Sequence, residues 1–414
     1  MTDLRKIIQM KDYNAFAGPD WPSYQQILDG EAVGNASIQS EVSEFVSMMT
    51  QTYNDITIDG NILAEQNQQR QDQIFFDKQL HSIGHCQTPW NTLGVNNNGD
   101  IFICSSPSWI PKFVGNILEV ETIFDALNSD MAQKIRQEIL AGRYFYCNNR
   151  ICGFFNKIPL DTYQTLPLDT QPLPSLTSHD LLVDQIPKNL IFDFDYTCNY
   201  QCPSCRKEVI NWNSDSTFAP INDRIVERIK HQVIDRIGAQ PVNIRWAGGE
   251  PFISRAYIEL LEYIIAAGKT NITNVIQTNG SYLKSKSDVL ARLAPYIQEL
   301  RISFDAATAT TYSQVRKNGV WSNLIHNVRH AQHVLGSNRI TADFVVQADN
   351  YQEIPLFVDL CRDLGIQRIN WQKMWNWGTW SQAEFDTKNI YDKSHPDYDK
   401  LVKIFAQAGQ RIQH

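Results

Sequence analysis

The pattern of apolar and polar positions changes character near residue 188. From there on, short runs rich in β-branched and aromatic residues alternate with stretches whose apolar residues recur at helical spacing. The short runs predict strands at 189–196, 242–252, 274–280, 299–306, 340–348 and 368–375. The periodic stretches predict helices at 223–238, 257–268, 286–297, 321–336 and 354–365. Such alternation predicts parallel β/α units with right-handed crossovers, whose chemistry gathers at the carboxyl ends of the strands.

The chain upstream of residue 188 has no such regular alternation. Residues 1–80 hold mixed helical signals and polar runs such as "EQNQQRQDQ", without an internal repeat, and no role is assigned to them. Residues 157–187 are rich in proline and turn formers, which is typical of a linker. We therefore expect a region of unknown role at 1–80, a cysteine-containing domain at 81–156, a Pro-rich linker at 157–187, a core barrel at 188–385 and a C-terminal helical tail at 386–414.

Composition and charge narrow the function classes. The chain has 414 residues, 43% of them hydrophobic and 20% charged, which is ordinary for a soluble protein of more than one domain. A net charge of −8 argues against a nucleic-acid partner, because phosphate recognition normally shows as a basic patch. The first residues lack the apolar core of a signal peptide, and no run approaches the ~20 apolar residues of a membrane span. We expect a cytoplasmic protein with no membrane partner.

Eight cysteines in such a compartment suggest metal ligation or redox chemistry, because disulfides are rare there. Cys361 lies in a helical pattern and is expected to be a small buried hydrophobe. The other seven fall into two groups: a triplet of Cys198, Cys202 and Cys205 just beyond the first strand, and an upstream set of Cys86, Cys104, Cys147 and Cys152. A structural zinc site is closed by four ligands, so the triplet alone would leave one incomplete.

The C-x3-C-x2-C spacing of the triplet resembles that of the radical SAM enzymes. By this resemblance, the three thiolates hold three irons of a [4Fe–4S] cluster, and the fourth iron binds the amino and carboxylate groups of S-adenosylmethionine (SAM). "WAGGEP" matches the family's GGEP motif and places Gly248, Gly249 and Glu250 at the end of the second strand. Paired glycines let the backbone come close to a ligand, and Glu250 is expected to hold the methionine ammonium. Alone, the motif could be an ordinary strand-end turn.

Further motifs follow at the next strand ends. "QTNG" and "ISFDA" resemble the family's ribose and methionine contacts, and the arginine of "YSQVRKNG" resembles the one that pairs with the SAM carboxylate. The residues concerned are Thr278, Asn279, Ser303, Asp305 and Arg316. Singly, each could be a turn residue or a solvated charge, and their order along the barrel supports the resemblance. Ser204 departs from the pattern, because many members carry an aromatic residue there against the adenine; Tyr200 or Val346 is a candidate substitute.

The upstream cysteines lie in segments that resemble SPASM or twitch auxiliary-cluster domains, namely "CQTPW", "NGDIFIC" and "VGNILE". Gly99 in "NNNGD" predicts a tight hairpin between "TLGV" and "IFIC". The resemblance implies that Cys86, Cys104, Cys147 and Cys152 hold one auxiliary [4Fe–4S] cluster with no open iron, which favours electron transfer or structural positioning. A full SPASM domain has more cysteines and follows the barrel, whereas this one precedes it. A structural zinc site with four thiolates is the alternative.

Four tryptophans lie at or just past the last strand, in "WQKMWNWGTW": Trp371, Trp375, Trp377 and Trp380. A tryptophan cluster usually serves packing, and this interpretation is favoured over a groove for an extended polypeptide.

The resemblance implies an α/β fold, a partial (β/α)6 TIM-like radical SAM barrel with a smaller N-terminal α+β cysteine-rich domain. It also implies a mechanism in which the reduced cluster gives an electron to the SAM sulfonium and a 5′-deoxyadenosyl radical abstracts hydrogen from the substrate. We expect this substrate to be a ribosomally synthesised peptide or protein undergoing cross-linking, epimerisation, thioether formation or backbone excision. A flavodoxin- or ferredoxin-type protein is the expected electron donor, and a separate recognition protein is a candidate for delivering the substrate.

Two alternatives stay open. The first is radical chemistry on a small molecule. The second is a non-enzymatic iron–sulfur or zinc binding module, which would leave "WAGGEP" and "ISFDA" unexplained.

Overall fold

The computed structural model describes residues 86–140, 144–148, 152, 181–213 and 216–412. The region of unknown role at 1–80 lies outside these residues, and the expected linker is described only from Leu181 onward.

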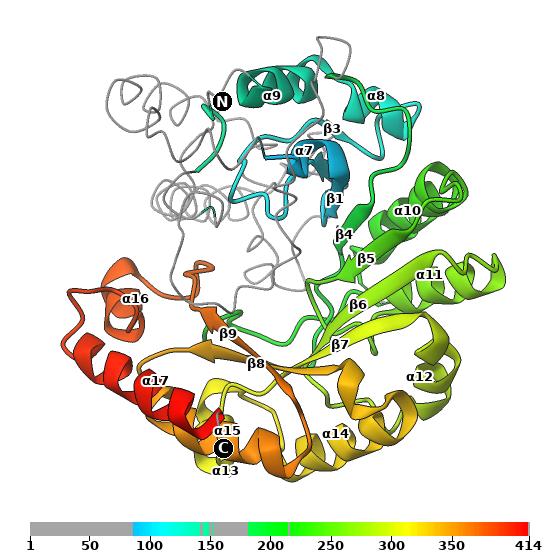
Figure 1. Ribbon diagram of the computed structural model, residues 1–414. Coiled ribbons are helices and arrows are strands. Elements are labelled where there is room, and N and C mark those ends of the chain that lie inside the picture. The colour runs from blue at the N-terminus through cyan, green and yellow to red at the C-terminus, as the bar shows by residue number, and fades with distance from the viewer. Residues whose placement is uncertain (1–85, 141–143, 149–151, 153–180, 214–215, 413–414) are drawn as a thin grey trace, which may run out of the picture.

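One nine-stranded sheet forms the centre of the molecule, in the order β3-β2-β1-β4-β5-β6-β7-β8-β9 (Figure 1). Neighbouring strands from β4 to β9 pair in parallel. The strands are β1 (Thr92–Asn96), β2 (Asp100–Phe102), β3 (Gly115–Asn116), β4 (Asn189–Asp193), β5 (Val242–Trp246), β6 (Ile272–Thr278), β7 (Ile297–Ser303), β8 (Ile340–Val346) and β9 (Arg368–Lys373). The six strands expected from the sequence correspond to β4 through β9.

Helices connect the parallel strands and cover the convex face of the curved sheet (Figure 1). They are α10 (Ala219–Ile229), continued by a π-helical turn (Lys230–Ile234), α11 (Arg255–Ala266), α12 (Ser287–Leu293), α13 (Ala309–Val315), α14 (Trp321–Leu335) and α15 (Ile354–Asp363). Two helices follow β9, α16 (Gln382–Lys388) and α17 (Tyr398–Ile412). The expected α/β fold with a partial TIM-like barrel is confirmed.

The core lies between the sheet and these helices. Trp371 on β9 packs at ring-centroid distances of 5.3 Å from Phe344, 5.8 Å from Phe357 and 5.5 Å from Phe405. These rings join β8 and β9 to α15 and α17, so Trp371 is a packing residue, as favoured from the sequence. Cys361 on α15 is also buried, as expected.

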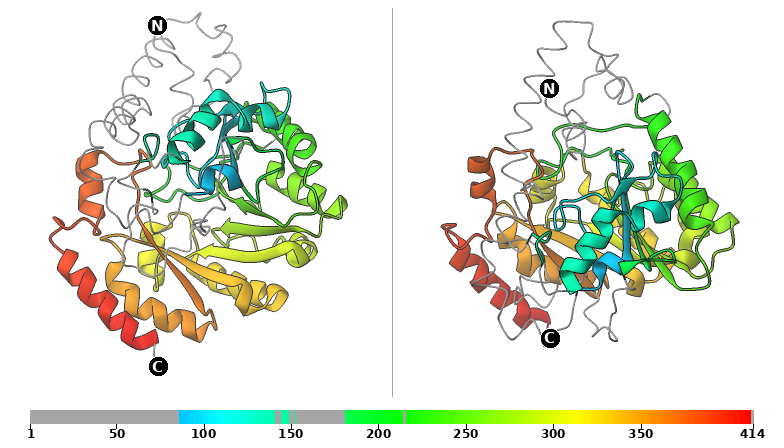
Figure 2. Two further views of the ribbon diagram at one scale, coloured as in Figure 1. Left: turned by 45° about the horizontal axis from the view of Figure 1, so that its top comes forward. Right: turned by 90° about the horizontal axis from the view of Figure 1, so that it is seen from above.

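The upstream segment, described at residues 86–140, 144–148 and 152, joins the same sheet and does not build a separate one. Strand β1 pairs in parallel with β4, with Leu93 opposite Leu190, and forms a hairpin with β2. Gly99 turns this hairpin with φ +81°, which confirms the predicted tight turn. Three short helices complete the segment: α7 (Thr88–Asn91), α8 (Ile123–Leu127) and α9 (Asp130–Leu140). Figure 2 shows these elements beside the β4 end of the sheet, with α17 at the opposite end.

Arg136 on α9 ties the upstream segment to the chain that enters β4. Its guanidinium is fully buried and donates to the carbonyl oxygens of Pro89 at 3.0 Å, Leu127 at 2.8 Å and Leu181 at 2.8 Å. Burial lowers the pKa of Arg136 to about 10. Three separate stretches of backbone therefore depend on one side chain for their hydrogen bonds.

We predict that Arg136→Met lowers the free energy of unfolding by about 3 kcal/mol, because it leaves several buried carbonyls unpaired. Urea unfolding followed by circular dichroism measures the change. Arg362→Met is the control, because Arg362 is exposed and pairs with Asp359 on the surface of α15, where such pairs contribute about 0–1 kcal/mol. Equal losses in the two variants would contradict the anchoring role of Arg136.

Candidate functional site

A cavity of about 340 Å³ lies at the carboxyl ends of the parallel strands. Residues from β4 to β9 line it, together with residues of the upstream segment. The structure brings ten of the sequence-predicted residues to its wall: Cys198, Cys202, Cys205, Gly248, Gly249, Thr278, Asn279, Ser303, Asp305 and Arg316. Glu250 is the exception among those predicted to contact SAM or its cluster, because its side chain is buried behind the wall.

The cysteine triplet sits on a loop that hydrogen bonds fold back on itself. Cys198 and Ile210 pair through both backbone groups, with N···O distances of 2.7 and 3.2 Å. A turn follows in which the amide of Cys205 donates to the carbonyl of Cys202 at 2.9 Å. All three cysteines of this loop line the cavity. Cys198 and Cys202 are buried, and burial raises the pKa of the Cys202 thiol to about 11.

Each of the three sulfur atoms receives at least one N–H donor. The amide of Tyr200 lies 3.5 Å from Cys198 Sγ, Arg316 Nη1 lies 3.7 Å from Cys202 Sγ, and Arg206 Nη2 lies 3.4 Å from Cys205 Sγ. Asn279 Nδ2 adds a longer contact of 3.8 Å to Cys198 Sγ. Such donors favour thiolate over thiol and are the hydrogen bonds that iron–sulfur ligands commonly receive. The donor set therefore fits a cluster held by three cysteines.

Sequence reasoning missed Arg206. The available signal was a guanidinium directly after the last cysteine of the triplet, because a fixed positive charge beside thiolates stabilises them.

Gly248 and Gly249 are required by the way two backbone segments meet. Gly248 has φ +98°, and a Cβ at Gly249 would lie 2.1 Å from the carbonyl oxygen of Thr197. The amide of Glu250 donates to the same oxygen at 2.7 Å. The turn after β5 is thus fastened directly to the start of the cysteine loop, and both glycines also line the cavity.

Glu250 links two strand ends from behind the cavity wall. Its carboxylate accepts from Thr278 Oγ1 at 2.7 Å, from the amide of Asn279 at 2.6 Å and from the amide of Phe252 at 3.2 Å. Burial raises the pKa of this carboxyl to about 7, although the hydrogen bonds act in the opposite direction. The contact with a methionine ammonium stays a prediction, because the described carboxylate faces β6.

Asp305 and Arg316 form a buried ion pair at the cavity wall. Arg316 Nη2 lies 2.7 Å from Asp305 Oδ2, while Asp305 Oδ1 accepts from the amide of Val345 at 2.7 Å. Asp305 has φ +57°, a sparsely populated conformation that costs of order 1–3 kcal/mol and is typical of functional sites. The buried Nε of Arg316 has no hydrogen-bond partner among the described residues.

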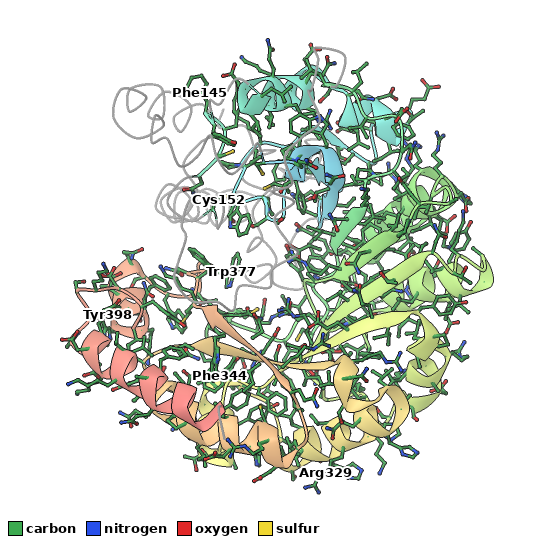
Figure 3. The ribbon with its side chains drawn as sticks, viewed as in Figure 1. Phe145, Cys152, Arg329, Phe344, Trp377 and Tyr398 are labelled. Carbon is green, nitrogen blue, oxygen red and sulfur yellow. The ribbon has the colours of Figure 1, made fainter. Side chains whose placement is uncertain are left out.

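The residues named as candidates for contact with the adenine differ in their exposure to the cavity. Ser204 and Tyr200 line the cavity, and the Tyr200 hydroxyl lies 3.2 Å from that of Tyr312. Val346 is fully buried and is not part of the wall, because side chains alternate along β8; its neighbour Val345 lines the cavity instead. Trp375 and Trp377 also line it, so only Trp371 of these three is a core residue. Figure 3 shows Trp377 beyond the end of β9.

The four upstream cysteines are buried and lie close enough to influence one another. Burial raises the pKa of Cys104 and Cys147 well above the ordinary range, and the nearby thiols of Cys86 and Cys152 raise both further. Figure 3 shows Cys152 in the upstream part of the molecule. No group of three or more His, Cys, Asp or Glu side chains in the described ranges is gathered tightly enough to hold a metal ion. In an iron–sulfur cluster each cysteine binds its own iron, whereas the ligands of a zinc ion converge on one atom.

The upstream segment also supplies one wall of the cavity. Phe102, Ser105 and Pro107 line it on this side. Arg245 on β5 donates from Nη2 to the carbonyl oxygen of Ser105 at 3.1 Å. Ser105 follows Cys104 directly, so the two cysteine groups lie on segments that meet at the same cavity.

Comparisons with known proteins agree with this geometry. Residues 194–361 match the family model of the Radical SAM superfamily. A GTP 3',8-cyclase of Marinobacter nauticus is 26% identical over 167 residues, 40% of this chain and 47% of that protein. A probable GTP 3',8-cyclase of Saccharolobus solfataricus is 24% identical over 183 residues, 44% of this chain and 56% of that protein. The chain spans about half the length of these curated relatives.

Solved structures with partial similarity include Streptococcus suis SuiB bound to precursor peptide SuiA. Its TM-score is 0.38 and its identity 18%, covering 68% of this chain and 60% of that one. The structure of anSMEcpe with bound AdoMet has a TM-score of 0.35 and 15% identity, covering 45% of this chain and 51% of that one.

No helix within the described ranges is both long and apolar enough to cross a membrane. The family match covers the cysteine triplet, the glycine turn (Gly248 and Gly249) and the Asp305–Arg316 pair. Residues 194–361 are therefore a radical SAM domain.

Proposed function

We propose that this protein is a radical SAM enzyme that binds a [4Fe–4S] cluster and SAM in the cavity and removes a hydrogen atom from an organic substrate. The observation that carries the proposal is the triplet itself, with three thiols on one cavity wall and an N–H donor at each sulfur. When bound, the cluster and SAM would supply the one-electron chemistry, and the protein would supply binding, orientation and electrostatics.

Each group of residues has a proposed part in this binding. Cys198, Cys202 and Cys205 would hold the cluster. The peptide groups of the glycine turn, together with Glu250, would bind the amino end of SAM, and Arg316 would bind its carboxylate through the Nε–H that has no described partner.

The ribose hydroxyls would meet the polar side chains at the ends of β6 and β7, namely Thr278, Asn279 and Ser303, all of which line the cavity. Trp375, Trp377 and Phe102 face the same space and would exclude water from a reactive radical.

A peptide or protein is the proposed substrate. The cavity wall includes two aromatic side chains beyond β9, and aromatic residues are enriched where proteins recognise polypeptides. Lys373 lies 5.5 Å from the Trp375 ring, which places a cation beside this aromatic surface. An external flavodoxin- or ferredoxin-type donor and a separate recognition protein belong to the same proposal.

A small-molecule substrate is the second candidate. It is favoured by the curated relatives, which are named GTP 3',8-cyclases, and by Arg245 in the cavity wall, where a guanidinium could meet an anionic group.

The upstream cysteines are proposed to hold an auxiliary [4Fe–4S] cluster of SPASM or twitch type. Four buried cysteines support this, with Cys86 and Cys152 close enough to raise the pKa of both Cys104 and Cys147, as does the position of Ser105 in the cavity wall directly after Cys104. A structural zinc site is the alternative.

We predict that changing Cys198, Cys202 and Cys205 together to alanine abolishes formation of 5′-deoxyadenosine and lowers the iron content from about eight to about four per chain. Mass spectrometry after anaerobic reduction measures the nucleoside. Cys361→Ala is the matched control, because this cysteine is buried in α15 and does not line the cavity. Persistence of 5′-deoxyadenosine in the triple variant would refute the proposed function.

We predict a different outcome for Cys147→Ala with Cys152→Ala. Uncoupled 5′-deoxyadenosine should still form in a protein that is folded by circular dichroism, while modification of a co-expressed candidate peptide should stop, because a closed cluster is not needed for SAM cleavage. Metal analysis should show a loss of about four irons. Loss of one zinc instead would replace the auxiliary cluster by a structural site, and unfolding would indicate a metal needed for stability.

A further inference from the structure

Arg206 is the buried cation nearest to the third cysteine of the triplet. Arg206 is only 7% exposed. Its guanidinium makes three hydrogen bonds to described residues. Nη1 donates to the carbonyl oxygen of Tyr196 at 2.8 Å. Nη2 lies 3.4 Å from Cys205 Sγ and 3.3 Å from the carbonyl oxygen of Gly248. One side chain therefore joins the end of the cysteine loop to its beginning and to the glycine turn.

Arg206 forms no ion pair with a carboxylate among the described residues, which distinguishes it from Arg316. Its charge is still close enough to Glu250 to act on the pKa of that carboxyl, in the lowering direction. Arg316 is paired with Asp305 at 2.7 Å, so part of its charge is already neutralised. Arg206 instead contacts sulfur, with Nη2 at 3.4 Å from Cys205 Sγ. A buried guanidinium normally requires an anion close by, and cysteine sulfurs that ligate a cluster would supply that negative charge.

We propose that Arg206 is the counterion and positioning residue of the triplet, holding Cys205 against the glycine turn and offsetting the negative charge of a cluster bound there. This inference rests on the proposed function of the site. A fixed positive charge favours the more negative, reduced form of a cluster, and hydrogen bonds to its sulfur ligands act in the same direction. Arg206 would therefore make a cluster bound there easier to reduce.

The charge and the hydrogen bonds of Arg206 can be separated by two substitutions. Arg206→Lys keeps the positive charge and loses the planar fork, whereas Arg206→Gln keeps a donor and loses the charge. Arg228→Gln is the matched control. Arg228 also donates to backbone carbonyls, those of Ile117 at 2.8 Å and of Val120, but it does not line the cavity.

The experiment uses the full-length chain, reconstituted anaerobically with iron and sulfide. Iron content is measured first, and the midpoint potential is then followed by electron paramagnetic resonance, using the signal that changes on addition of SAM. Arg206→Gln should lower the equilibrium constant for one-electron reduction about tenfold, which corresponds to a potential about 59 mV more negative. Arg206→Lys should stay within about threefold of the wild type, and Arg228→Gln should not differ from it.

Several results would overturn the inference. A wild-type potential in Arg206→Gln would show that the charge has no effect on the cluster. If the Lys and Gln variants lose iron equally, Arg206 is only a structural anchor. If Arg206→Gln does not fold, the test rests on Arg206→Lys. A folded Arg206→Lys with wild-type iron content and midpoint potential supports the counterion role, whereas an unfolded Arg206→Lys overturns it. Failure of the proposed function itself looks different, because the wild-type chain would then give no SAM-sensitive signal and no 5′-deoxyadenosine.

Discussion

The close approach of Gly249 to Thr197 is the contact on which the site depends. A Cβ at position 249 would lie 2.1 Å from the carbonyl oxygen of Thr197 and would collide with it. Because Gly249 has no Cβ, the turn after β5 can lie directly against the start of the cysteine loop. The amide of Glu250 then bonds to the same carbonyl, and its carboxylate reaches across to β6. One tight backbone contact thus fixes three adjacent strand ends relative to one another. The positions of the thiols follow from it, because the loop that carries them leaves from Thr197.

Three arginines of the cavity wall each have their own set of partners. Arg316 meets the carboxylate of Asp305 and the sulfur of Cys202, whereas Arg206 meets the sulfur of Cys205. Arg245, with Asp193 as a nearby opposite charge, also donates to the Ser105 carbonyl of the upstream wall. Desolvation makes an unpaired buried charge costly, so these pairings limit where further negative charge can be accommodated.

Much of this arrangement could be predicted from local sequence, and the rest depends on contacts between distant residues. The alternation of strands and helices, the hairpin at Gly99 and the burial of Cys361 are set by nearby residues and turn geometry, and all three were predicted. The orientation of the Glu250 carboxylate toward β6, behind the cavity wall, was not predicted. It is decided by hydrogen-bond donors such as Thr278, about 28 residues away in the sequence. Arg206 was missed because its partners, Tyr196 and Gly248, come close only after folding. Val345 rather than Val346 lines the cavity because the register of β8 sets which side chains face inward.

The pairing of β1 with β4 changes what the upstream cysteines can do. A separate domain on a linker could move relative to the barrel, but strands in one sheet are held by a ladder of backbone hydrogen bonds. Arg136 and Arg228 add further bonds between the upstream segment and its surroundings. The wall formed by Phe102, Ser105 and Pro107 is therefore a fixed part of the cavity. Any group held by the neighbouring cysteines would stay at a constant distance from the triplet.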